Sequence, residues 1–290
     1  MSDRQIEFGA FCKLTAVISC LSLAPVTLAQ APPAESKTAK IQRLGYNPTS
    51  IQGFTVAIHQ QYQLLLGKRQ YGNLTEAISA DLEDAAKAIP KEKRKTIQDV
   101  TIWIEWDDSK FPQINFANQY IQPLGMYIPR GKRYPVDDLF ADKRGGIMVS
   151  GKECFTRHGV EMLQEYSAYW MLHELSHAFQ DLTIGLENEK VEAAYKQAVD
   201  GGLYRSVEGK MLDSATGKIK AGKVDAYALY SHKEYFAELS VAYLAKNNTY
   251  PHTHLDLKKY DPRGYELMRK SWGEKPVPVP ILLPTFPLIF

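Results

Sequence analysis

Several short segments in the first half of the chain have the hydrophobic pattern of strands. Near-alternation of apolar and polar positions over residues 51–59, and the β-branched and aromatic residues at 100–106, each predict a strand. Shorter apolar segments at residues 125–128 and 146–150 predict two more strands. Loops containing Pro and Gly separate them, so this half of the chain is expected to supply a small sheet.

Longer segments carry hydrophobic residues at helical spacing, mostly in the second half of the chain. Four helices are predicted, at residues 74–89, 160–181, 187–199 and 231–245. Pro90 ends the first of them, and Ser231 is expected to cap the last. Residues 210–225 are rich in Gly, Lys, Ser and Thr, which predicts a surface loop or hairpin. Strands followed by helices favour an α+β fold with a small mixed sheet over an alternating βαβ fold.

The predicted helix at residues 160–181 contains the sequence His-Glu-Leu-Ser-His. Because a helix turns once in about 3.6 residues, His173 and His177 project from one face and can bind one metal ion, with Glu174 beside the water that the metal activates. The surrounding residues are mostly apolar, and three polar side chains in a buried helix are unfavourable unless something satisfies them. The alternative is a pair of core histidines bonded to neighbouring groups. We favour a zinc site.

A zinc hydrolase needs one more protein ligand, since three protein donors hold the metal and water takes the fourth position. Metzincins place a glycine and a third histidine where this chain has Gln180 and Thr183, which excludes that class. Glu234 and Glu238 lie four residues apart on the predicted helix at 231–245, so one can bind metal while the other accepts the ring N–H of a ligand histidine. The alternatives are a solvated acidic face, or a third ligand among His232, His252 and His254.

The segments HELSHAFQD and EYFAE together resemble the gluzincin branch of the zincin metallopeptidases, specifically the catalytic domain of anthrax lethal factor-like peptidases and related secreted bacterial proteins. Outside these two segments the similarity is loose. The resemblance implies a zincin-like fold and a Zn²⁺ ion held by His173, His177 and Glu234. It also implies that Glu174 is the general base.

The resemblance carries three further expectations. A tyrosine seven residues before the ligand glutamate assists catalysis in that family, and here it is Tyr227, with Tyr230 as a competitor. The stretch between the two motifs is longer than in compact gluzincins such as thermolysin, so residues 210–223 are expected to be an insertion. Zincin substrates lie extended along an edge strand above the motif helix, and residues 146–150 are expected to form that edge. Separately, Asp181, one turn beyond the motif, is either a second acceptor for a ligand histidine or a surface acid.

The composition of the 290-residue chain is that of a globular protein, with 44% hydrophobic residues, 23% charged residues and a formal net charge of +2. Because Lys and Arg are scattered among Asp and Glu, no nucleic-acid partner is expected. Residues 1–29 have a basic start, an apolar run and a small-residue end, which predicts a secretory signal peptide cleaved near Ala29. An uncleaved anchor is one alternative. Lipidation at Cys20, which follows a lipobox-like Val-Ile-Ser sequence, is another.

Cleavage near Ala29 would leave Cys154 as the only cysteine of the mature chain, so no intramolecular disulfide is expected. We interpret Cys154 as a small buried residue, with metal ligation as the alternative. Residues 30–42 are predicted to be a flexible leader, residues 43–272 the catalytic domain and residues 273–290 an extended Pro-rich apolar tail. No integral membrane span is expected after signal cleavage.

These features predict a secreted or periplasmic zinc metallopeptidase that hydrolyses peptides or proteins. Two rival functions stay open: a zinc-containing module that binds an envelope component without cleaving it, and a zinc amidase that acts on cell-wall peptide. The intact Glu174 favours an enzyme, because a module that only binds has no need of that carboxylate. Zinc is inferred from the types of ligand, and other divalent ions can occupy the same donors.

Overall fold

The computed structural model describes residues 35–64, 74–106, 114–116, 119–121, 125–131, 140–150, 169–213 and 218–274. The expected signal peptide, Cys20, Cys154 and the tail beyond Glu274 lie outside these residues, as does the first part of the helix predicted at 160–181. None of the helices within the described ranges is both long enough and apolar enough to cross a membrane.

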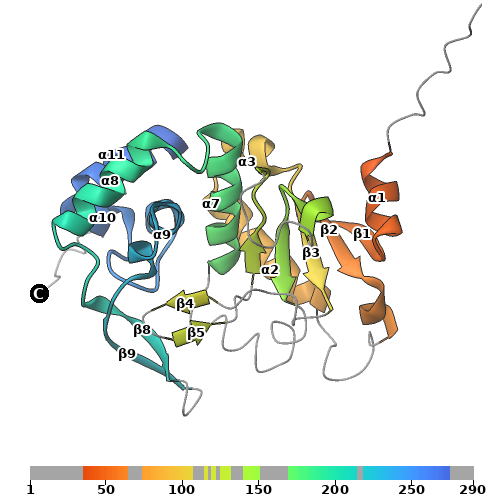
Figure 1. Cartoon of the computed structure of the whole chain (residues 1–290), viewed down its shortest axis with the longest axis horizontal. Helices are drawn as coiled ribbons and strands as arrows, with labels where there is room; N and C mark the ends of the chain where they lie inside the picture. The colour runs from red at the N-terminus through yellow and green to blue at the C-terminus, as the bar shows by residue number, and fades with distance from the viewer. Residues whose placement is uncertain are drawn as a thin grey trace, which may run out of the picture. The chain divides into compact units, whose positions relative to one another are not determined.

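The fold is α+β and is built on a five-stranded mixed sheet with the strand order β1-β2-β3-β7-β6 (Figure 1). Strands β2, β3 and β7 run parallel, whereas β1 and β6 pair antiparallel with their neighbours at the two edges. The bounds are β1 (Tyr46–Ile51), β2 (Phe54–His59), β3 (Thr101–Glu105), β6 (Gly125–Tyr127) and β7 (Ile147–Ser150). The predicted small mixed sheet is therefore confirmed.

The strand predicted at residues 51–59 is confirmed as β2 over residues 54–59, but it begins later than predicted and forms a hairpin with β1. Strands β1 and β2 are joined at Gln52 and Gly53, whose φ angles of 51° and 82° are those of a tight hairpin turn. The prediction missed β1 because only its two ends, Tyr46 and Ile51, are buried, so its apolar residues do not alternate.

The expectation that residues 146–150 form the edge of the sheet is wrong. Strand β7 lies inside the sheet, between β3 and β6, and all four of its residues are buried. The edge strand beside β7 is β6, which packs against the helix that carries the motif. Hydrophobicity identifies both segments as strands, but the order of strands depends on pairings that the local pattern does not encode.

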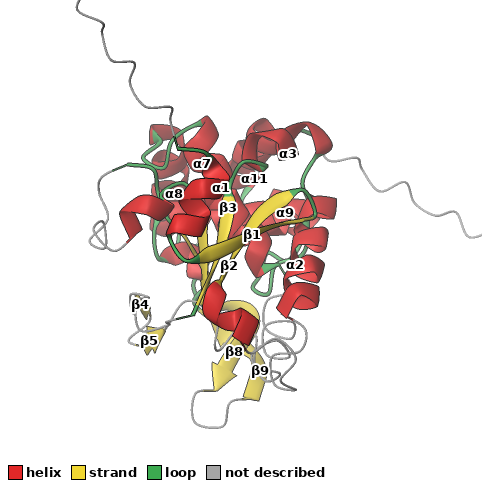
Figure 2. Ribbon diagram, turned by 90° about the vertical axis from the view of Figure 1, so that its right-hand side faces the viewer, coloured by secondary structure: helices red, strands yellow, loops and turns green. Residues whose placement is uncertain are grey.

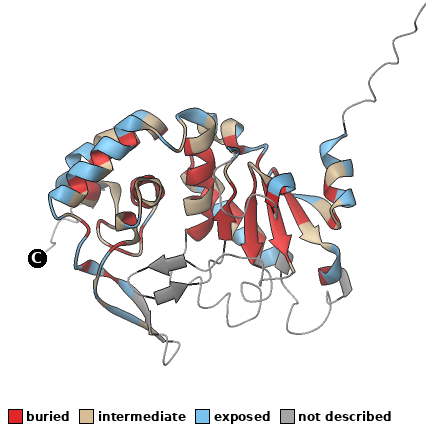
Figure 3. Ribbon diagram, viewed as in Figure 1, coloured by how far each residue is buried: buried red, intermediate tan, exposed pale blue. Residues whose placement is uncertain are grey.

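Helices cover both faces of the sheet, and alternate residues of its strands point to each side. Ile102 and Ile104 of β3 belong to the large core, which lies under α2 (Leu74–Ala88), α3 (Lys91–Ile97) and α7 (Trp170–Thr183). Trp103 belongs to the smaller core under α1 (Lys37–Arg43) and the short 3-10 helix η3 (Ala141–Lys143). Figure 3 shows the inner strands of the sheet and much of α7 as buried.

Helix α1 occupies part of the segment expected to be a flexible leader. Ser36 caps it by accepting a hydrogen bond from the backbone N–H of Ala39, and Ile41 is buried in the smaller core. Residues 37–42 therefore belong to the folded body. The segment is mostly polar in composition, so the sequence did not indicate that burial of Ile41 anchors a helix here.

The C-terminal part is helical and surrounds one central helix. Helix α9 (His232–Leu244) contacts α7, α8 (Glu189–Asp200), α10 (His254–Tyr260) and α11 (Pro262–Trp272), and each of its residues from 235 to 244 is buried. The predicted helices at 74–89, 187–199 and 231–245 are confirmed, as is the N-cap Ser231.

The remaining elements are small. The hairpin of β8 (Val207–Asp213) and β9 (Lys218–Val224) extends away from the helices and occupies the expected insertion (Figure 2). A second two-stranded sheet pairs β4 (Ile114–Phe116) with β5 (Gln119–Ile121), and the short 3-10 helices η1 (Gln60–Leu64) and η4 (Tyr227–Leu229) complete the elements used below.

The ionisation of Asp81 in α2 makes the stability of the fold depend on pH. Its carboxylate accepts a hydrogen bond from Trp170 Nε1 at 3.0 Å, and burial raises its pKa to about 6. In the unfolded chain this carboxyl has a lower pKa. The contribution of Asp81 to the free energy of unfolding is therefore complete only below the pKa of the unfolded chain, and it is lost as the pH rises through the pKa of the folded protein.

We expect Asp81→Asn to raise the free energy of unfolding by about 2 kcal/mol at pH 8, because the amide still accepts from Trp170 but carries no charge. The gain should shrink toward zero below pH 4. Urea denaturation at several pH values measures it, with Glu76→Gln, an exposed change on the same helix, as the control. A gain that does not vary with pH would contradict this explanation.

Candidate metal centre

The packing of α7 against α9 brings the two sequence motifs together. Figure 1 shows α9 end-on beside α7. His173, Glu174 and His177 come from α7, and Glu234 and Glu238 come from α9. Ser231 fixes the start of α9, since its Oγ accepts a hydrogen bond from the backbone N–H of Glu234. The cap thus sets the first turn of the helix, on which Glu234 lies.

Three side-chain atoms meet at the contact between these helices. Glu234 Oε2 lies 2.9 Å from His173 Nε2 and 3.1 Å from His177 Nε2, and the two nitrogens are 3.1 Å apart. The side chains of His173, His177 and Glu234 are only 12%, 10% and 17% exposed, so water cannot satisfy them fully. The three predicted ligands are therefore neighbours and form a group that could hold a metal ion.

Hydrogen atoms alone cannot satisfy all three of these contacts. If both rings carry a hydrogen on Nε2, both can donate to Glu234 Oε2, but the contact between the two nitrogens then has two donors and no acceptor. If only one ring does, the lone pair of the other faces the carboxylate oxygen of Glu234. A cation accepts all three lone pairs at once. A tetrahedral zinc ion would separate its ligand atoms by about 3.3 Å, close to the observed spacing.

Glu238 lies behind the first histidine, as expected. Its Oε1 is 2.8 Å from His173 Nδ1, so the carboxylate accepts the hydrogen on that nitrogen; in the neutral ring this leaves the lone pair on Nε2, which faces His177 and Glu234. Burial opposes a charged imidazole, yet Glu234 and Glu238 together raise the pKa of His173 above its ordinary value. Burial likewise opposes the charge on Glu234, but His177 and His173 hold the pKa of its carboxyl well below the usual range.

Glu174 faces the edge strand of the sheet. Its Oε2 accepts a hydrogen bond from the backbone N–H of Tyr127 at 2.8 Å, and burial raises the pKa of its carboxyl. One oxygen is therefore held by β6 while the carboxylate stays beside the two histidines of the same helix.

Asp181 bonds to the end of β6 and not to a motif histidine. Its Oδ2 accepts from the Tyr127 hydroxyl at 2.7 Å and from the backbone N–H of Arg130 at 3.1 Å. The expectation that it accepts from a ligand histidine is corrected, because Glu238 occupies the histidine nitrogen and the Asp181 side chain reaches the end of β6. Tyr127 is thereby fixed to α7 at its backbone, through Glu174, and at its ring, through Asp181.

The two candidate tyrosines differ in their distance from the centre. The ring of Tyr227 lies 5.9 Å from that of His173, centroid to centroid, and Tyr230 stacks on Tyr227 at 5.6 Å. The Tyr230 side chain is on the outside, 45% exposed. Burial, followed by the charge on Glu234, raises the pKa of Tyr227, so its hydroxyl keeps its hydrogen at neutral pH.

The rival histidines have other partners. His232 Nε2 lies 3.0 Å from the carbonyl oxygen of Leu186 and 3.1 Å from Glu187, in a second acidic group completed by Glu192. Because a carbonyl only accepts, this nitrogen carries a hydrogen, and Lys233 already pairs with Glu187. This group needs no cation.

His252 and His254 also lie away from the three ligand atoms. His252 Nδ1 is 3.0 Å from the carbonyl oxygen of Asn247, and the ring of His254 stands 6.4 Å from that of Tyr243. Neither belongs to the group of potential ligands at the centre.

Sequence reasoning did not identify Tyr127 or Asn247. Tyr127 lies in a three-residue strand, and nothing in the local pattern indicates that its N–H faces the motif glutamate. Asn247 follows α9 in an irregular segment and donates its side-chain N–H to Glu238 Oε2 at 2.9 Å. Both contacts join residues brought together only by the fold.

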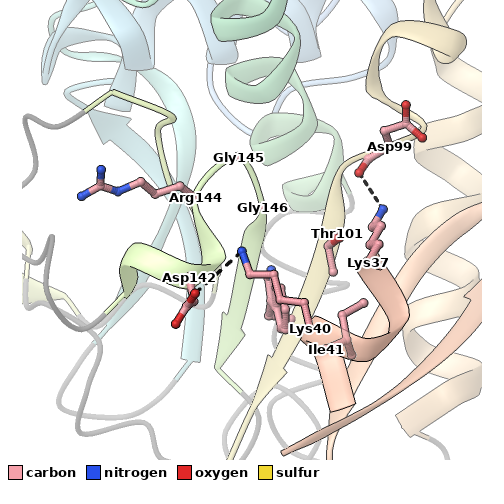
Figure 4. Close-up of a pocket in the computed structure, with 10 residues that line it drawn as sticks. Lys37, Lys40, Ile41, Asp99, Thr101, Asp142, Arg144, Gly145 and Gly146 are labelled. Atoms are coloured by element: carbon pink, nitrogen blue, oxygen red, sulfur yellow. Dashed lines mark hydrogen bonds and ion pairs between the residues drawn. The ribbon is translucent and has the colours of Figure 1, made fainter. Parts of the chain in front are cut away.

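A polar pocket of about 120 Å³ beside α1 is separate from this centre and contains none of its residues. Its charged groups are already paired: Lys37 Nζ donates to the carbonyl oxygen of Asp99 at 2.8 Å, and Lys40 lies 3.9 Å from Asp142 (Figure 4). The amino groups of these two lysines therefore already have partners within the protein.

Comparison with models of known protein families, with curated proteins and with solved structures gives no match.

We expect the purified chain to bind one Zn²⁺ ion and to unfold at a higher temperature with zinc than with a chelator, because the ion binds only the folded arrangement. His177→Ala should weaken zinc binding by more than about 100-fold, beyond the range of changes to residues that only support a ligand. Competition with a chromophoric chelator measures the affinity. His232→Ala, in the second acidic group, is the control, and equal losses in the two variants would place the ion elsewhere.

Proposed function

We propose that this chain is a zinc-dependent metallopeptidase of the gluzincin type. The observation that carries the proposal is the convergence of His173 Nε2, His177 Nε2 and Glu234 Oε2, with contacts that a cation satisfies better than hydrogens do. Glu174, on the same helix, supplies the proton acceptor that hydrolysis requires.

The arrangement of elements also supports a zincin-like fold. The motif helix α7 packs beside an antiparallel edge strand, β6, of a mixed sheet, and a later helix, α9, contributes the third donor. These are the features that the resemblance to gluzincins leads one to expect.

Zinc, when bound, supplies a Lewis acid that lowers the pKa of a water molecule toward ~7 and polarises a carbonyl group. The chain's own part is to bind the ion through His173, His177 and Glu234. Glu174 accepts the proton of the attacking water and then donates it to the leaving amine. Since Tyr127 N–H holds Oε2 of Glu174, Oε1 is the oxygen that moves the proton. Tyr227 donates a hydrogen bond to the oxygen on which negative charge develops.

The substrate class comes from the resemblance to zincins, whose substrates lie extended along an edge strand beside the motif helix. The backbone N–H of Tyr127 points away from β7, toward α7, while that of the next residue, Ile128, donates to the carbonyl of Gly146. The N–H on the outer side of β6 at Tyr127 is thus already donated to Glu174, and all three residues of this strand are buried. We assign peptides or proteins as substrates, outside the cytoplasm if the predicted signal peptide operates.

A module that binds zinc without cleaving a substrate is less well supported. Such a module gives no physical reason for burying Glu174 beside two imidazoles with one oxygen fixed by the sheet. A zinc amidase uses the same chemistry, so assays should include cell-wall peptides beside ordinary peptide libraries.

Glu174→Gln should retain zinc affinity and reduce peptide hydrolysis by about 10²–10⁴-fold, since the amide keeps the shape but cannot accept the proton. Fluorogenic peptide libraries and zinc titration of the same preparation measure the two properties. Glu192→Gln, in the second acidic group, should leave both unchanged. If the Glu174→Gln variant still hydrolyses peptides at the wild-type rate, Glu174 does not transfer the proton.

Tyr227→Phe should lower kcat by about 10²-fold with little change in KM, because it removes a donor used mainly as charge develops in the transition state. Tyr230→Phe is the matched control, since its ring stacks on that of Tyr227 and is largely exposed. Steady-state kinetics on one peptide substrate compare the two variants. A larger loss in the Tyr230 variant would reverse the assignment.

A further inference from the structure

Behind the first histidine, a buried chain of hydrogen bonds continues past Glu238. Glu238 Oε1 lies 2.8 Å from His173 Nδ1, and Glu238 Oε2 accepts from Asn247 Nδ2 at 2.9 Å. The Asn247 amide also lies 3.3 Å from the carbonyl oxygen of Glu238. Glu238 and Asn247 are each only 8% exposed. Each carboxylate oxygen is thus bonded within the protein, one to a histidine and the other to an amide.

The direction of these hydrogen bonds is fixed by the amide oxygen of Asn247. Asn247 Oδ1 accepts from the backbone N–H of Asn248 at 2.8 Å, so the amide cannot turn over without losing that bond. Nδ2 therefore donates to Glu238. With one oxygen engaged in this way, the other oxygen faces His173 and accepts the hydrogen on Nδ1.

The backbone of Asn247 is fixed as firmly as its side chain. Its N–H donates to the carbonyl oxygen of His252 at 2.8 Å, and its own carbonyl oxygen accepts from His252 Nδ1 at 3.0 Å. His252 thus anchors the segment after α9. Asn247 is in consequence a rigid donor presented to the far side of Glu238.

We propose that Asn247 is a positioning residue for the metal centre: it orients the Glu238 carboxylate, which in turn keeps the hydrogen of His173 on Nδ1 and its Nε2 lone pair toward the ion. This inference rests on the zinc centre of the proposed function. It predicts that zinc affinity depends on a residue that touches no ligand. Changes to such supporting groups typically weaken metal binding by about 10–100-fold.

Exchanging the amide and the carboxylate between positions 247 and 238 tests this series of hydrogen bonds directly. Asn247→Asp places two carboxylates face to face, and Glu238→Gln places two amide donors face to face, so each single variant should bind zinc about 10–100-fold more weakly. In the double variant, the amide introduced at position 238 can donate to the carboxylate introduced at position 247 while its oxygen still accepts from His173. We expect the double variant to recover most of the lost affinity, a non-additive result in a double-mutant cycle.

The matched control is Ser240→Ala on the same helix. Ser240 is buried and accepts a hydrogen bond from Trp272 Nε1 at 2.9 Å, and its own hydroxyl hydrogen goes to the carbonyl oxygen of Phe236, so its bonds lead away from Glu238 and His173. This variant should lose stability without losing zinc affinity. If Asn247→Asp does not fold, Asn247→Ala removes the donor without adding a charge and should show the same loss of affinity.

Zinc affinity by chelator competition separates the outcomes without any assay of hydrolysis. Additive losses in the double variant, or losses at Asn247 no larger than at Ser240, would overturn the positioning assignment while leaving the metal centre intact. Failure of the wild-type chain to bind zinc would overturn the proposed centre itself, and this inference with it. Recovery of zinc affinity in the double variant would establish that Asn247 acts on His173 through Glu238.

Discussion

The meeting of two imidazole nitrogens and one carboxylate oxygen within 2.9–3.1 Å is the constraint on which the account depends. Three lone pairs held so closely in a nearly dry site are unfavourable unless protons or a cation lie among them. Without an ion, protons on the imidazoles fill this role, since Glu234 and Glu238 raise the pKa of His173; an ion bound at the proposed centre would replace those protons. In the proposed centre, metal binding and stability are therefore coupled through this one contact.

The surrounding structure shows how that contact is held. The central helix α9 is buried along most of its length, and Tyr235, next to Glu234, donates its hydroxyl hydrogen to the buried Asp261 at 2.5 Å. Tyr204 donates to the same carboxylate at 2.8 Å. On the other side, Tyr127 joins α7 to the edge strand at two points. The ligands thus stand on elements anchored from both flanks, as a preorganised site requires.

How much of this the sequence could predict depends on the range of the interactions. The spacing of His173 and His177 and the cap at Ser231 are local, so the motif helix and the helix bearing Glu234 were predicted from the pattern alone. The partner of Asp181, the interior place of β7 and the burial of Ile41 depend on contacts between distant segments, and here the predictions were wrong. Glu238 was found because it shares a helix face with Glu234, whereas Asn247, beyond the end of that helix, gave no signal.

The most direct test is a crystal structure of the zinc-soaked protein with anomalous diffraction recorded on both sides of the zinc absorption edge. The account predicts one strong anomalous peak between His173, His177 and Glu234, with Glu238 still bonded to the far nitrogen of His173. A peak at Glu187, Glu192 and His232 instead, or Glu234 turned toward solvent with no peak beside it, would contradict it.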